Sequence, residues 1–344
     1  MTIQLKLSAA LLGLGASLGL AFGIAGEAAA QTKFKFTLDW AFQGPTAAFL
    51  LAEQKGYYKA EGLDVTLDAG QGSAGALQRV ATGAYEMGFA DINALIEYNV
   101  KNADKQVKAV MMAYDAPPFG AYALKSSGIK TPKDMEGKKL GAPVFDASFK
   151  LFPAFAAKTG IDLKKVTNIN LAPPLREPSL KNGSVDFITG HFFSSLLDLK
   201  KIGVDPNDVQ VFFYSDFGMD FYGNAVIASP SFMAANPNAV KGFVKATIKA
   251  WQEIAKDPKI GSAAAKTRDG LIDEALELER LNLSLQRNVL TPWVKANGFG
   301  DVDAGRLERS AKAVAEAVGL ERAPKADELF TNAFLPPKAE RMMP

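Results

Sequence analysis

Apolar and polar residues alternate along short stretches near the start of the chain. In residues 33–38 and 63–67 every second position is apolar, which is typical of β-strands with one buried face. Helical patterns at 47–55 and 70–82 follow these strands, and glycines mark where the helices start or stop. Strands that alternate with helices in this way predict βαβ units and a mostly parallel sheet.

The alternation continues to about residue 228 and then gives way to helices. Further strands are expected at 86–89, 107–113, 120–124, 139–142, 166–171, 187–189, 209–213 and 225–228. Further helices are expected at 94–99, 149–158, 239–255, 272–288 and 305–318. The pattern restarts near residue 120, and a chain of 344 residues is long enough for two α/β domains.

The first 30 residues have the pattern of a secretory leader. Lys6 precedes an apolar stretch at 7–24, and Ala28 and Ala30 occupy the two positions that a signal peptidase reads. An uncleaved membrane anchor is the alternative, because the apolar stretch approaches spanning length. The glycines in that stretch and the A-x-A exit favour cleavage, so we expect residues 1–30 to be a signal peptide and the mature protein to be periplasmic.

The composition removes several classes of function. There is no cysteine, which excludes disulfides and a lipid anchor on cysteine, and a single histidine cannot build the usual zinc sites. The formal charge is +2 with both signs interspersed, so no nucleic-acid surface is expected. The chain can bury a sizeable core without covalent links. We expect a soluble monomer with no metal and no cofactor.

Several phrases of the sequence occur together in one known family. They are Leu38-Asp39-Trp40, the stretch AEQKGYYKAEGLDV at 52–65, GAYEMGFAD at 83–91, KTPKDMEGKKLG at 130–141 and LKNGSVD at 180–186. Together they resemble the substrate-binding proteins of ABC uptake transporters for nitrate, sulfonates, taurine and thiamine pyrimidine precursors. The opening phrase is most similar to the thiamine-precursor branch.

This resemblance implies a fold, a partner and a mode of action. The implied fold is a two-lobed clamshell, the type II periplasmic-binding-protein fold, with doubly wound sheets and a helical C-terminus. Lobe I would comprise 33–119 plus 225–344 and lobe II 120–224, with two strands crossing between them and a ligand cleft in the interface. The implied role is capture of a small molecule for a membrane permease, without catalysis.

The stretch after Trp40 departs from the thiamine-precursor pattern. Those members carry a histidine a few residues after the Asp-Trp pair, whereas this chain reads AFQGPT at 41–46. Related fungal pyrimidine synthases use a cysteine cluster for iron, and this chain has no cysteine. Both departures argue against synthase activity, and a secreted enzyme of that kind is the alternative to a receptor.

Residues 70–75 read G-Q-G-S-A-G between an expected strand and an expected helix, with Asp91 about twenty positions further on. This spacing matches the dinucleotide fingerprint. The preceding strand alternates with polar residues instead of forming a continuous buried run, which disfavours that interpretation. Two interpretations remain open: a backbone cradle for a polar group of the ligand, to which Ser73 adds a hydroxyl, or a plain helix N-cap.

A second turn and the single histidine complete the candidate site. Phe145, Asp146 and Ser148 precede or open an expected helix and would form the equivalent cradle on the opposite lobe, or simply cap the helix. His191 follows an expected strand, at the edge where doubly wound sheets place ligands. A structural, hydrogen-bonded histidine is as well supported as a ligand contact.

Aromatic residues gather at these turns, although many phenylalanines in any protein belong to the core. Flat rings with few fixed charges suit a flat, weakly charged ligand, so we expect a pyrimidine-like compound or an aromatic carboxylate. Arg79 lies in an expected helix and Arg176 in a Pro-rich loop, so an arginine fork for sulfonate or nitrate is not evident. The candidate ligand contacts are Trp40, Phe42, Pro45, Ser73, Asp91, Phe145, Asp146, Ser148, His191, Phe192 and Tyr222.

Overall fold

Alternating burial builds the first strands of the protein in a computed structural model that describes residues 31–344. The predicted leader lies outside the described residues. In β2 (Leu63–Asp68) buried and exposed residues alternate strictly, and β2 pairs in parallel with β1 (Thr32–Thr37) along its whole length. The period-two pattern marks β2 because only one of its faces is buried, whereas β1 buries both Phe36 and Thr37 at its end.

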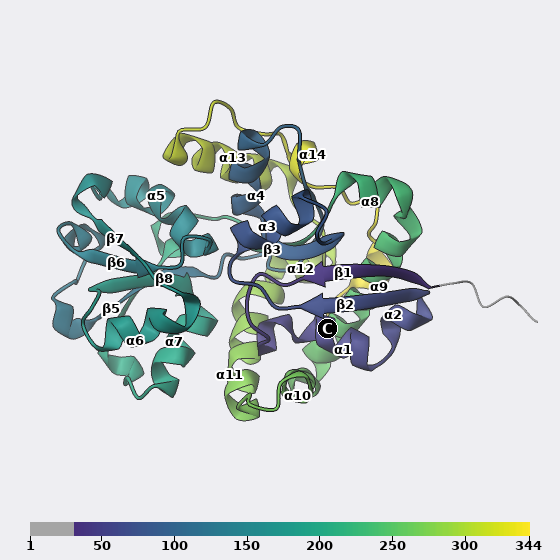
Figure 1. The fold of residues 1–344 in the computed structure, drawn as a ribbon, viewed down its shortest axis with the longest axis horizontal. Helices are drawn as coiled ribbons and strands as arrows, with labels where there is room; N and C mark the ends of the chain where they lie inside the picture. Colours follow the sequence, from purple (N-terminus) through teal and green to yellow (C-terminus); the bar gives the residue numbers. More distant parts are fainter. Residues whose placement is uncertain (1–30) are drawn as a thin grey trace, which may run out of the picture. The chain divides into compact units, whose positions relative to one another are not determined.

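The first sheet has five strands in the order β2-β1-β3-β10-β4 (Figure 1). Its remaining strands are β3 (Met87–Asp91), β4 (Lys108–Met112) and β10 (Asn224–Ala228). Because β10 pairs antiparallel with both neighbours, it is the one strand of the five that runs against the others. The sheet is thus mostly parallel, as predicted, with one inserted reversed strand.

The second sheet repeats this arrangement in the order β7-β6-β8-β5-β9. Its strands are β5 (Phe119–Leu124), β6 (Lys139–Ala142), β7 (Thr167–Asn170), β8 (Phe187–His191) and β9 (Val209–Phe213). Here β5 is the reversed strand. Two α/β sheets are therefore present, which confirms the predicted fold class.

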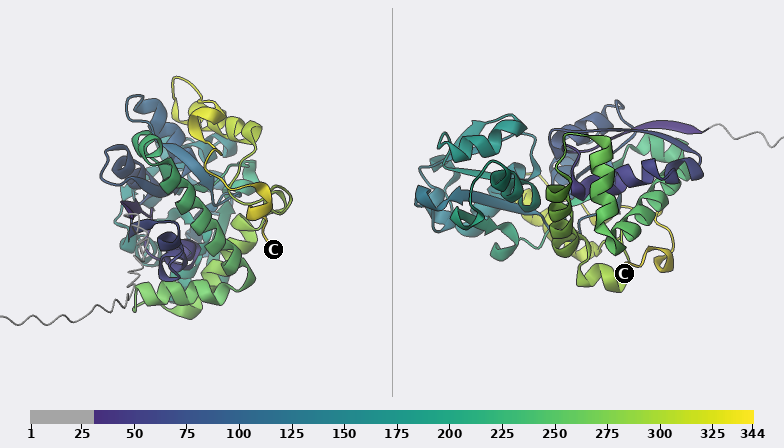
Figure 2. Two further views of the ribbon diagram at one scale, coloured as in Figure 1. Left: turned by 90° about the vertical axis from the view of Figure 1, so that its right-hand side faces the viewer. Right: turned by 90° about the horizontal axis from the view of Figure 1, so that it is seen from below.

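Helices flank both sheets and make up the C-terminal part of the chain (Figures 1 and 2). Before β10 they are α1 (Ala47–Gln54), α2 (Tyr57–Ala60), α3 (Ser73–Ala81), α4 (Ile92–Lys101), α5 (Ala147–Thr159), α6 (Arg176–Lys181) and α7 (Phe192–Lys201). After β10 they are α8 (Pro230–Ala235), α9 (Pro237–Lys256), α10 (Pro258–Arg268), α11 (Glu274–Ser284), α12 (Pro292–Asn297), α13 (Ala304–Val318) and α14 (Ala326–Leu329). Among residues 31–344 no helix is both long enough and apolar enough to span a membrane.

An aromatic cluster holds α9 to the first sheet. The ring of Phe243 in α9 lies 4.8 Å from the rings of Phe36 and Tyr58 and 5.7 Å from that of Phe34. All four side chains are buried. Burial of such large rings, together with their mutual packing, makes this cluster a main source of stability for the first sheet.

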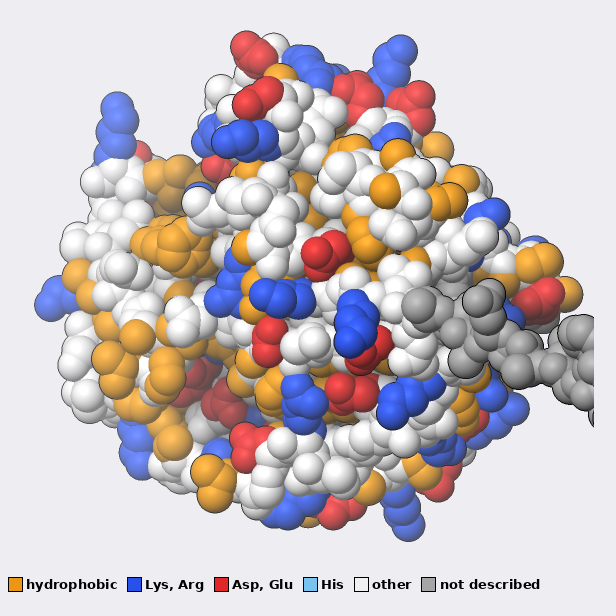
Figure 3. All heavy atoms as spheres, turned by 45° about the vertical axis from the view of Figure 1, so that its right-hand side comes forward, with side chains coloured by type: hydrophobic (Ala, Val, Ile, Leu, Met, Phe, Trp, Pro, Cys, Tyr) orange, Lys and Arg blue, Asp and Glu red, His pale blue; other side chains and the backbone are white. Residues whose placement is uncertain are grey.

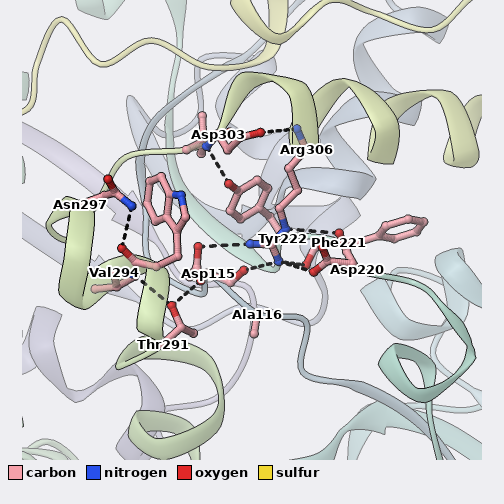
Figure 4. Close-up of polar contacts among 12 residues, drawn as sticks. Asp115, Ala116, Asp220, Phe221, Tyr222, Thr291, Val294, Asn297, Asp303 and Arg306 are labelled. Atoms are coloured by element: carbon pink, nitrogen blue, oxygen red, sulfur yellow. Dashed lines mark hydrogen bonds and ion pairs between the residues drawn. The ribbon is translucent and has the colours of Figure 1, made fainter.

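Two connections carry the chain between the sheets: residues 113–118, from β4 to β5, and residues 214–223, from β9 to β10. We call these the crossing segments. Arg306 of α13 joins them, because one of its terminal nitrogens donates to the carbonyl oxygens of Asp115 at 2.7 Å and of Phe221 at 2.9 Å (Figure 4). Helix α13 also packs on both α4 and α5, so it contacts elements beside each sheet.

Residues 31–344 form a single compact unit, so the lobe boundaries expected at 120 and 224 stay a prediction. For clarity, the first half denotes the first sheet with its flanking helices, and the second half denotes β5 to β9 with theirs. Basic and acidic side chains are interspersed on the face shown in Figure 3, in keeping with the formal charge of +2.

Candidate functional site

A small cavity lies where loops at the strand ends of the two halves meet. Its volume is about 30 Å³, which is room for about one water molecule. It is lined by Asp39, Trp40, Ala41, Gln43, Pro45, Thr46, Gly72, Ser73, Tyr114 and Asn224 from the first half, and by Asp146, Ala147, Arg176, His191, Phe193 and Ser194 from the second. We call this space the inner cavity.

A larger space adjoins the inner cavity and opens to solvent. It has a volume of about 700 Å³ and shares Trp40, Ala41 and Gln43 with the inner cavity. Its other walls are Gly70 and Gln71 from the first half, and Ala172, Pro173, Pro174, Glu177, Pro178, Asp198, Lys201 and Ile202 from the second. We call it the outer groove. Trp40 therefore stands between a buried space and an open one.

Asp39 anchors a buried polar network at the end of β1. Its Oδ2 accepts hydrogen bonds from Ser73 Oγ at 2.8 Å and from Asn224 Nδ2 at 2.6 Å. Ser73 Oγ in turn accepts from the main-chain N–H of Asp91 at 3.0 Å. Burial of the carboxyl group, with a smaller contribution from the negative charge of Asp146, raises the pKa of Asp39 to about 6, because the hydrogen bonds only partly offset the loss of solvation.

The glycine-rich turn brings the two halves into close contact. Gly72 has a φ of +139°, and a Cβ on it would lie 2.3 Å from the carbonyl oxygen of Phe145. The N–H of Ala74 donates to that same oxygen at 3.2 Å, and the N–H of Gly72 donates to Asp39 O at 2.6 Å. Ser73 does not cap α3, whose N-cap is Gly72. The helix N-cap interpretation of Ser73 is therefore wrong, because its hydroxyl donates a hydrogen bond to Asp39 instead of capping α3.

Arg176 lies in the inner cavity, although the sequence places it in a Pro-rich loop away from the candidate turns. The short turn at Pro173–Leu175 directs the start of α6 inward, and the Arg176 side chain is only 1% exposed. Its Nε donates to Glu177 Oε1 at 2.7 Å, and its Nη1 lies 3.6 Å from Asp146 Oδ2. Burial opposes the charge, but the two carboxylates hold the pKa of Arg176 above its usual range.

Two rings border this guanidinium. The Arg176 guanidinium carbon lies 5.1 Å from the centre of the Trp40 ring, close enough for a cation–π contact. His191 ends β8 and packs edge-on against Phe193, with ring centres 5.3 Å apart. Burial and, to a smaller extent, the positive charge of Arg176 together lower the pKa of His191 to about 3. His191 is therefore neutral at physiological pH.

Contacts between the halves surround the cavity. Ser194 Oγ donates to Gln43 Oε1 at 2.8 Å across the interface. Arg280 of α11 donates to the carbonyl oxygen of Phe193 at 2.6 Å and pairs with Asp198 at 2.9 Å. These contacts close the cavity on the side of α7, and the approach of Gly72 to Phe145 closes it on the other side.

Five predicted contacts are brought together in the lining of the inner cavity: Trp40, Pro45, Ser73, Asp146 and His191. Asp146 also caps α5, because its Oδ1 accepts from Phe149 N at 3.0 Å. Burial raises the pKa of Asp146, and the positive charge of Arg176 opposes that shift. Asp146 therefore both caps α5 and lines the inner cavity.

Three more predicted contacts belong to neighbouring structure outside the lining. Phe42 lies under the guanidinium of Arg268, at 4.9 Å. Asp91 is fully buried and caps α4, where its Oδ1 accepts from Ala94 N at 2.9 Å. Phe145 is 47% exposed, and its carbonyl oxygen accepts from the N–H of Ala74 in the first half.

The last three predicted contacts also lie outside the lining, and each is buried among other parts of the protein. The Ser148 side chain is fully buried in the first turn of α5. The ring of Phe192 lies under Arg287 at 5.5 Å. The Tyr222 hydroxyl accepts from Asp303 N at 2.7 Å, and its ring lies 4.0 Å from the Arg306 guanidinium in the network that joins the crossing segments (Figure 4).

The other lining residues were not among the sequence candidates, and they include Asp39, Tyr114, Arg176 and Asn224. Asp39 stands beside Trp40 in the Leu-Asp-Trp phrase, so that phrase could have indicated it. Tyr114 follows β4, and its hydroxyl donates to Pro45 O at 3.0 Å. Asn224 is the first residue of β10. Only the strand order places both beside β1 and β3. Within residues 31–344 no group of three or more His, Asp or Glu side chains forms a candidate metal site.

Comparison with known proteins adds to this geometry. A family model described as NMT1/THI5 like matches residues 44–260. A riboflavin-binding protein of Chloroflexus aurantiacus is 27% identical over 305 residues, which cover 84% of this chain and 82% of that protein. A 4-amino-5-hydroxymethyl-2-methylpyrimidine phosphate synthase of Schizosaccharomyces pombe is 25% identical over 235 residues, which cover 66% of each.

The fold has solved counterparts. The alkanesulfonate-binding protein of Xanthomonas axonopodis pv. citri, bound to MOPS, is similar with a TM-score of 0.69 and 14% identity, covering 88% of this chain and 99% of that one. Similarity at this identity shows the fold, which is that of periplasmic binding proteins. The type of fold predicted from the sequence is confirmed.

Proposed function

The chain belongs to the NMT1/THI5-like family, and from this premise we propose that it is the substrate-binding subunit of an ABC uptake transporter. It captures a small, flat heteroaromatic compound between its two halves and delivers it to a membrane permease. The observation that carries this proposal is the inner cavity, whose lining comes from both halves and includes an aromatic ring, Trp40, at its boundary with the outer groove. Interfaces of this kind are where small-molecule sites usually form.

Trp40 is well placed to contact a ligand that enters from the groove. It lines both spaces and is only partly buried, so one face of its ring can be covered by another flat ring. The family relative that binds riboflavin supports a flat heteroaromatic ligand, and riboflavin is the first compound to test. An aromatic carboxylate, the other compound expected from the sequence, is less well supported because the lining holds more acidic than basic side chains.

Binding requires the two halves to separate. An inner cavity of about 30 Å³ holds about one water molecule and is too small for a heteroaromatic ring. Rotation about the crossing segments would widen it, because its walls come from both sides, and closure would then bury the ligand. The predicted lobes, 33–119 plus 225–344 and 120–224, are the bodies that we expect to move.

A second candidate function is an enzyme of the synthase kind, which the Schizosaccharomyces pombe relative represents. The sequence has no cysteine, and the single histidine is neutral and packed against aromatic rings. A receptor needs neither a nucleophile nor a metal, so we favour binding without catalysis. Periplasmic location, removal of residues 1–30 and a monomeric state belong to the same proposal.

Native mass spectrometry and calorimetric titration test the proposal together. Protein purified from the periplasm should carry an unmodified heteroaromatic compound, and ligand-free protein should bind riboflavin with one site per chain. Recovery of a chemically altered product after incubation would favour the enzyme. Absence of both a co-purifying compound and riboflavin binding would refute the heteroaromatic ligand class.

A further inference from the structure

The charged groups of the inner cavity are unequal in number. Three carboxylates, those of Asp39, Asp146 and Glu177, lie at or beside the cavity, and each residue is no more than 5% exposed. One guanidinium, that of Arg176, lies among them, and it is engaged by Glu177 at 2.7 Å and faced by Asp146 at 3.6 Å. His191 adds no charge, because its pKa is about 3. The buried charge next to the cavity is therefore negative.

Among the residues that the structure describes, the inner cavity offers an entering anion no cation other than Arg176. The Arg176 fork, which could bind a sulfonate or a carboxylate through two parallel N–H groups, already faces two carboxylates of the protein itself. Two N–H groups of the glycine-rich turn are also in use, since that of Gly72 donates to Asp39 O and that of Ala74 to Phe145 O. An added anion would lie beside buried like charges, which is strongly unfavourable.

The cavity offers hydrogen-bond acceptors instead. Asn224 is fully buried, and its Nδ2 donates to Asp39, but its Oδ1 is buried and has no hydrogen-bond partner among residues 31–344. Asn224 lines the inner cavity beside Asp39. A buried carbonyl oxygen left unpaired is costly, and a ligand that donates a hydrogen bond to it would remove that cost.

We propose that the inner cavity selects an uncharged or positively charged heteroaromatic compound that presents N–H or amino groups to Asn224 and Asp39, and that it rejects anions. This rests on the proposed function and names the chemical class of its ligand. Arg176, held by Glu177 and Asp146, supports the Trp40 ring from the second half instead of binding the ligand's charge. The site thus differs in chemistry from one built to bind a sulfonate, although the fold is shared.

Matched pairs of compounds test the charge of the ligand by calorimetric titration. The pairs are riboflavin with riboflavin 5′-phosphate, and 4-amino-5-hydroxymethyl-2-methylpyrimidine with its phosphate ester; nitrate and ethanesulfonate are tested alone. The uncharged member of any pair that binds should bind at least about tenfold more tightly, and the two simple anions should not bind. Equal or tighter binding of the charged members, or binding of either simple anion, overturns this inference and leaves the proposed transport role intact. Failure of all four pair members overturns both.

Asp146→Asn provides a gain-of-function test. Asparagine keeps the side-chain oxygen that caps α5 but removes one of the two negative charges facing Arg176. Ethanesulfonate or nitrate, which should not bind to the unaltered protein, should then bind measurably. Asp257→Asn, which alters the cap of α10 away from the cavity, is the matched control and should change nothing. Unchanged anion binding in Asp146→Asn would contradict the assignment of Arg176.

Asn224→Leu tests the acceptor. It should lower the affinity for the uncharged compound that binds by about tenfold or more. Asn99→Leu is the control, because Asn99 is also a buried asparagine, in α4, and bonds only the main chain of Val107. Both variants should lose stability, but only Asn224→Leu should lose affinity. Equal affinity in the two variants would refute the role of Asn224, and if Asn224→Leu does not fold, the compound pairs and Asp146→Asn still decide the inference.

Discussion

Removal of the Trp40 ring should weaken ligand binding much more than it weakens the fold. Trp40 lies between the inner cavity and the outer groove, and its ring is only partly buried. In Trp40→Ala the ligand loses one stacking partner and the burial of a large ring. The Arg176 guanidinium, 5.1 Å from the ring centre, loses the same neighbour.

The magnitude follows from two contributions. Aromatic stacking contributes about 0.5–1.5 kcal/mol beyond the buried area. Burial of a large ring contributes about 1.5–3 kcal/mol more. Trp40→Ala should therefore weaken binding by roughly 2–4 kcal/mol, which is about 30- to 1000-fold in Kd. The folded protein should lose less, because water can occupy the space that a partly exposed ring leaves behind.

Calorimetric titration and thermal unfolding should be measured on the same preparations. Trp293→Ala is the matched control, because Trp293 is also partly buried but packs in α12, away from the cavity. It should lower Tm and leave Kd unchanged, whereas Trp40→Ala should raise Kd with a smaller change in Tm. Unchanged affinity in Trp40→Ala, or the same affinity loss in both variants, would remove Trp40 from the site.

Three further predictions concern the network around the cavity and the core. Because Asp39 has a pKa of about 6 in the folded protein against an ordinary 3.8, the stability linked to its neutral form is complete below about pH 3.8 and is lost as the pH rises through about 6. The free energy of unfolding of ligand-free Asp39→Asn, obtained from thermal melts, should therefore rise relative to that of the unaltered protein between pH 4 and 7, by up to about 3 kcal/mol. A difference in this free energy that does not change with pH would contradict the raised pKa. Arg306→Met should lower the free energy of unfolding in urea by about 2–4 kcal/mol, because it leaves main-chain oxygens of both crossing segments unpaired, and Arg309→Met on the exposed face of α13 should have no such effect. Phe243→Ala should cost about 3–5 kcal/mol in the same measurement, and a loss below 1 kcal/mol would show that the aromatic cluster repacks around the gap.

Local patterns in the sequence determined most of the strands. Alternation of apolar and polar residues in 63–67 places one face of β2 in the core, and the sequence of the paired strand β1 alternates in the same way although its last two residues are both buried. The long amphipathic helices α9 and α13 were likewise visible, because their buried residues recur at helical spacing. These elements were predictable because their patterns of buried and exposed positions lie in residues close together in the chain.

Elements with a weak pattern were missed for a physical reason. Helix α10 buries Gly261, Ser262, Ala264 and Ala265, small residues that give little contrast between its two faces. It packs closely against α1 and α11, where small side chains are needed. Its position is therefore decided by the neighbouring helices and not by its own sequence.

The candidate site divides in the same way. Trp40, Ser73, Asp146 and His191 stand at strand ends or helix starts, and the rule that ligands gather at the carboxyl ends of parallel strands was enough to predict them. Asp91 and Phe192 satisfy the same rule but lie outside the lining, because one caps α4 and the other is buried under Arg287. The rule identifies the edge of the sheet where the cavity lies, but it does not tell which side chains line that cavity.

Arg176 and Asn224 show what only the tertiary structure decided. The inward turn at Pro173–Leu175 carries Arg176 to the cavity, and the return of the chain from the second sheet to the first places Asn224 beside Asp39, 185 residues away in sequence. No local sequence pattern predicts that Arg176 reaches the cavity or that Asn224 reaches Asp39, because both contacts depend on how distant strands are ordered in the two sheets. The sequence by itself determined the class of fold and the edge of the sheet at which the cavity lies, whereas the charge and hydrogen-bonding character of that cavity arise only where the two halves meet.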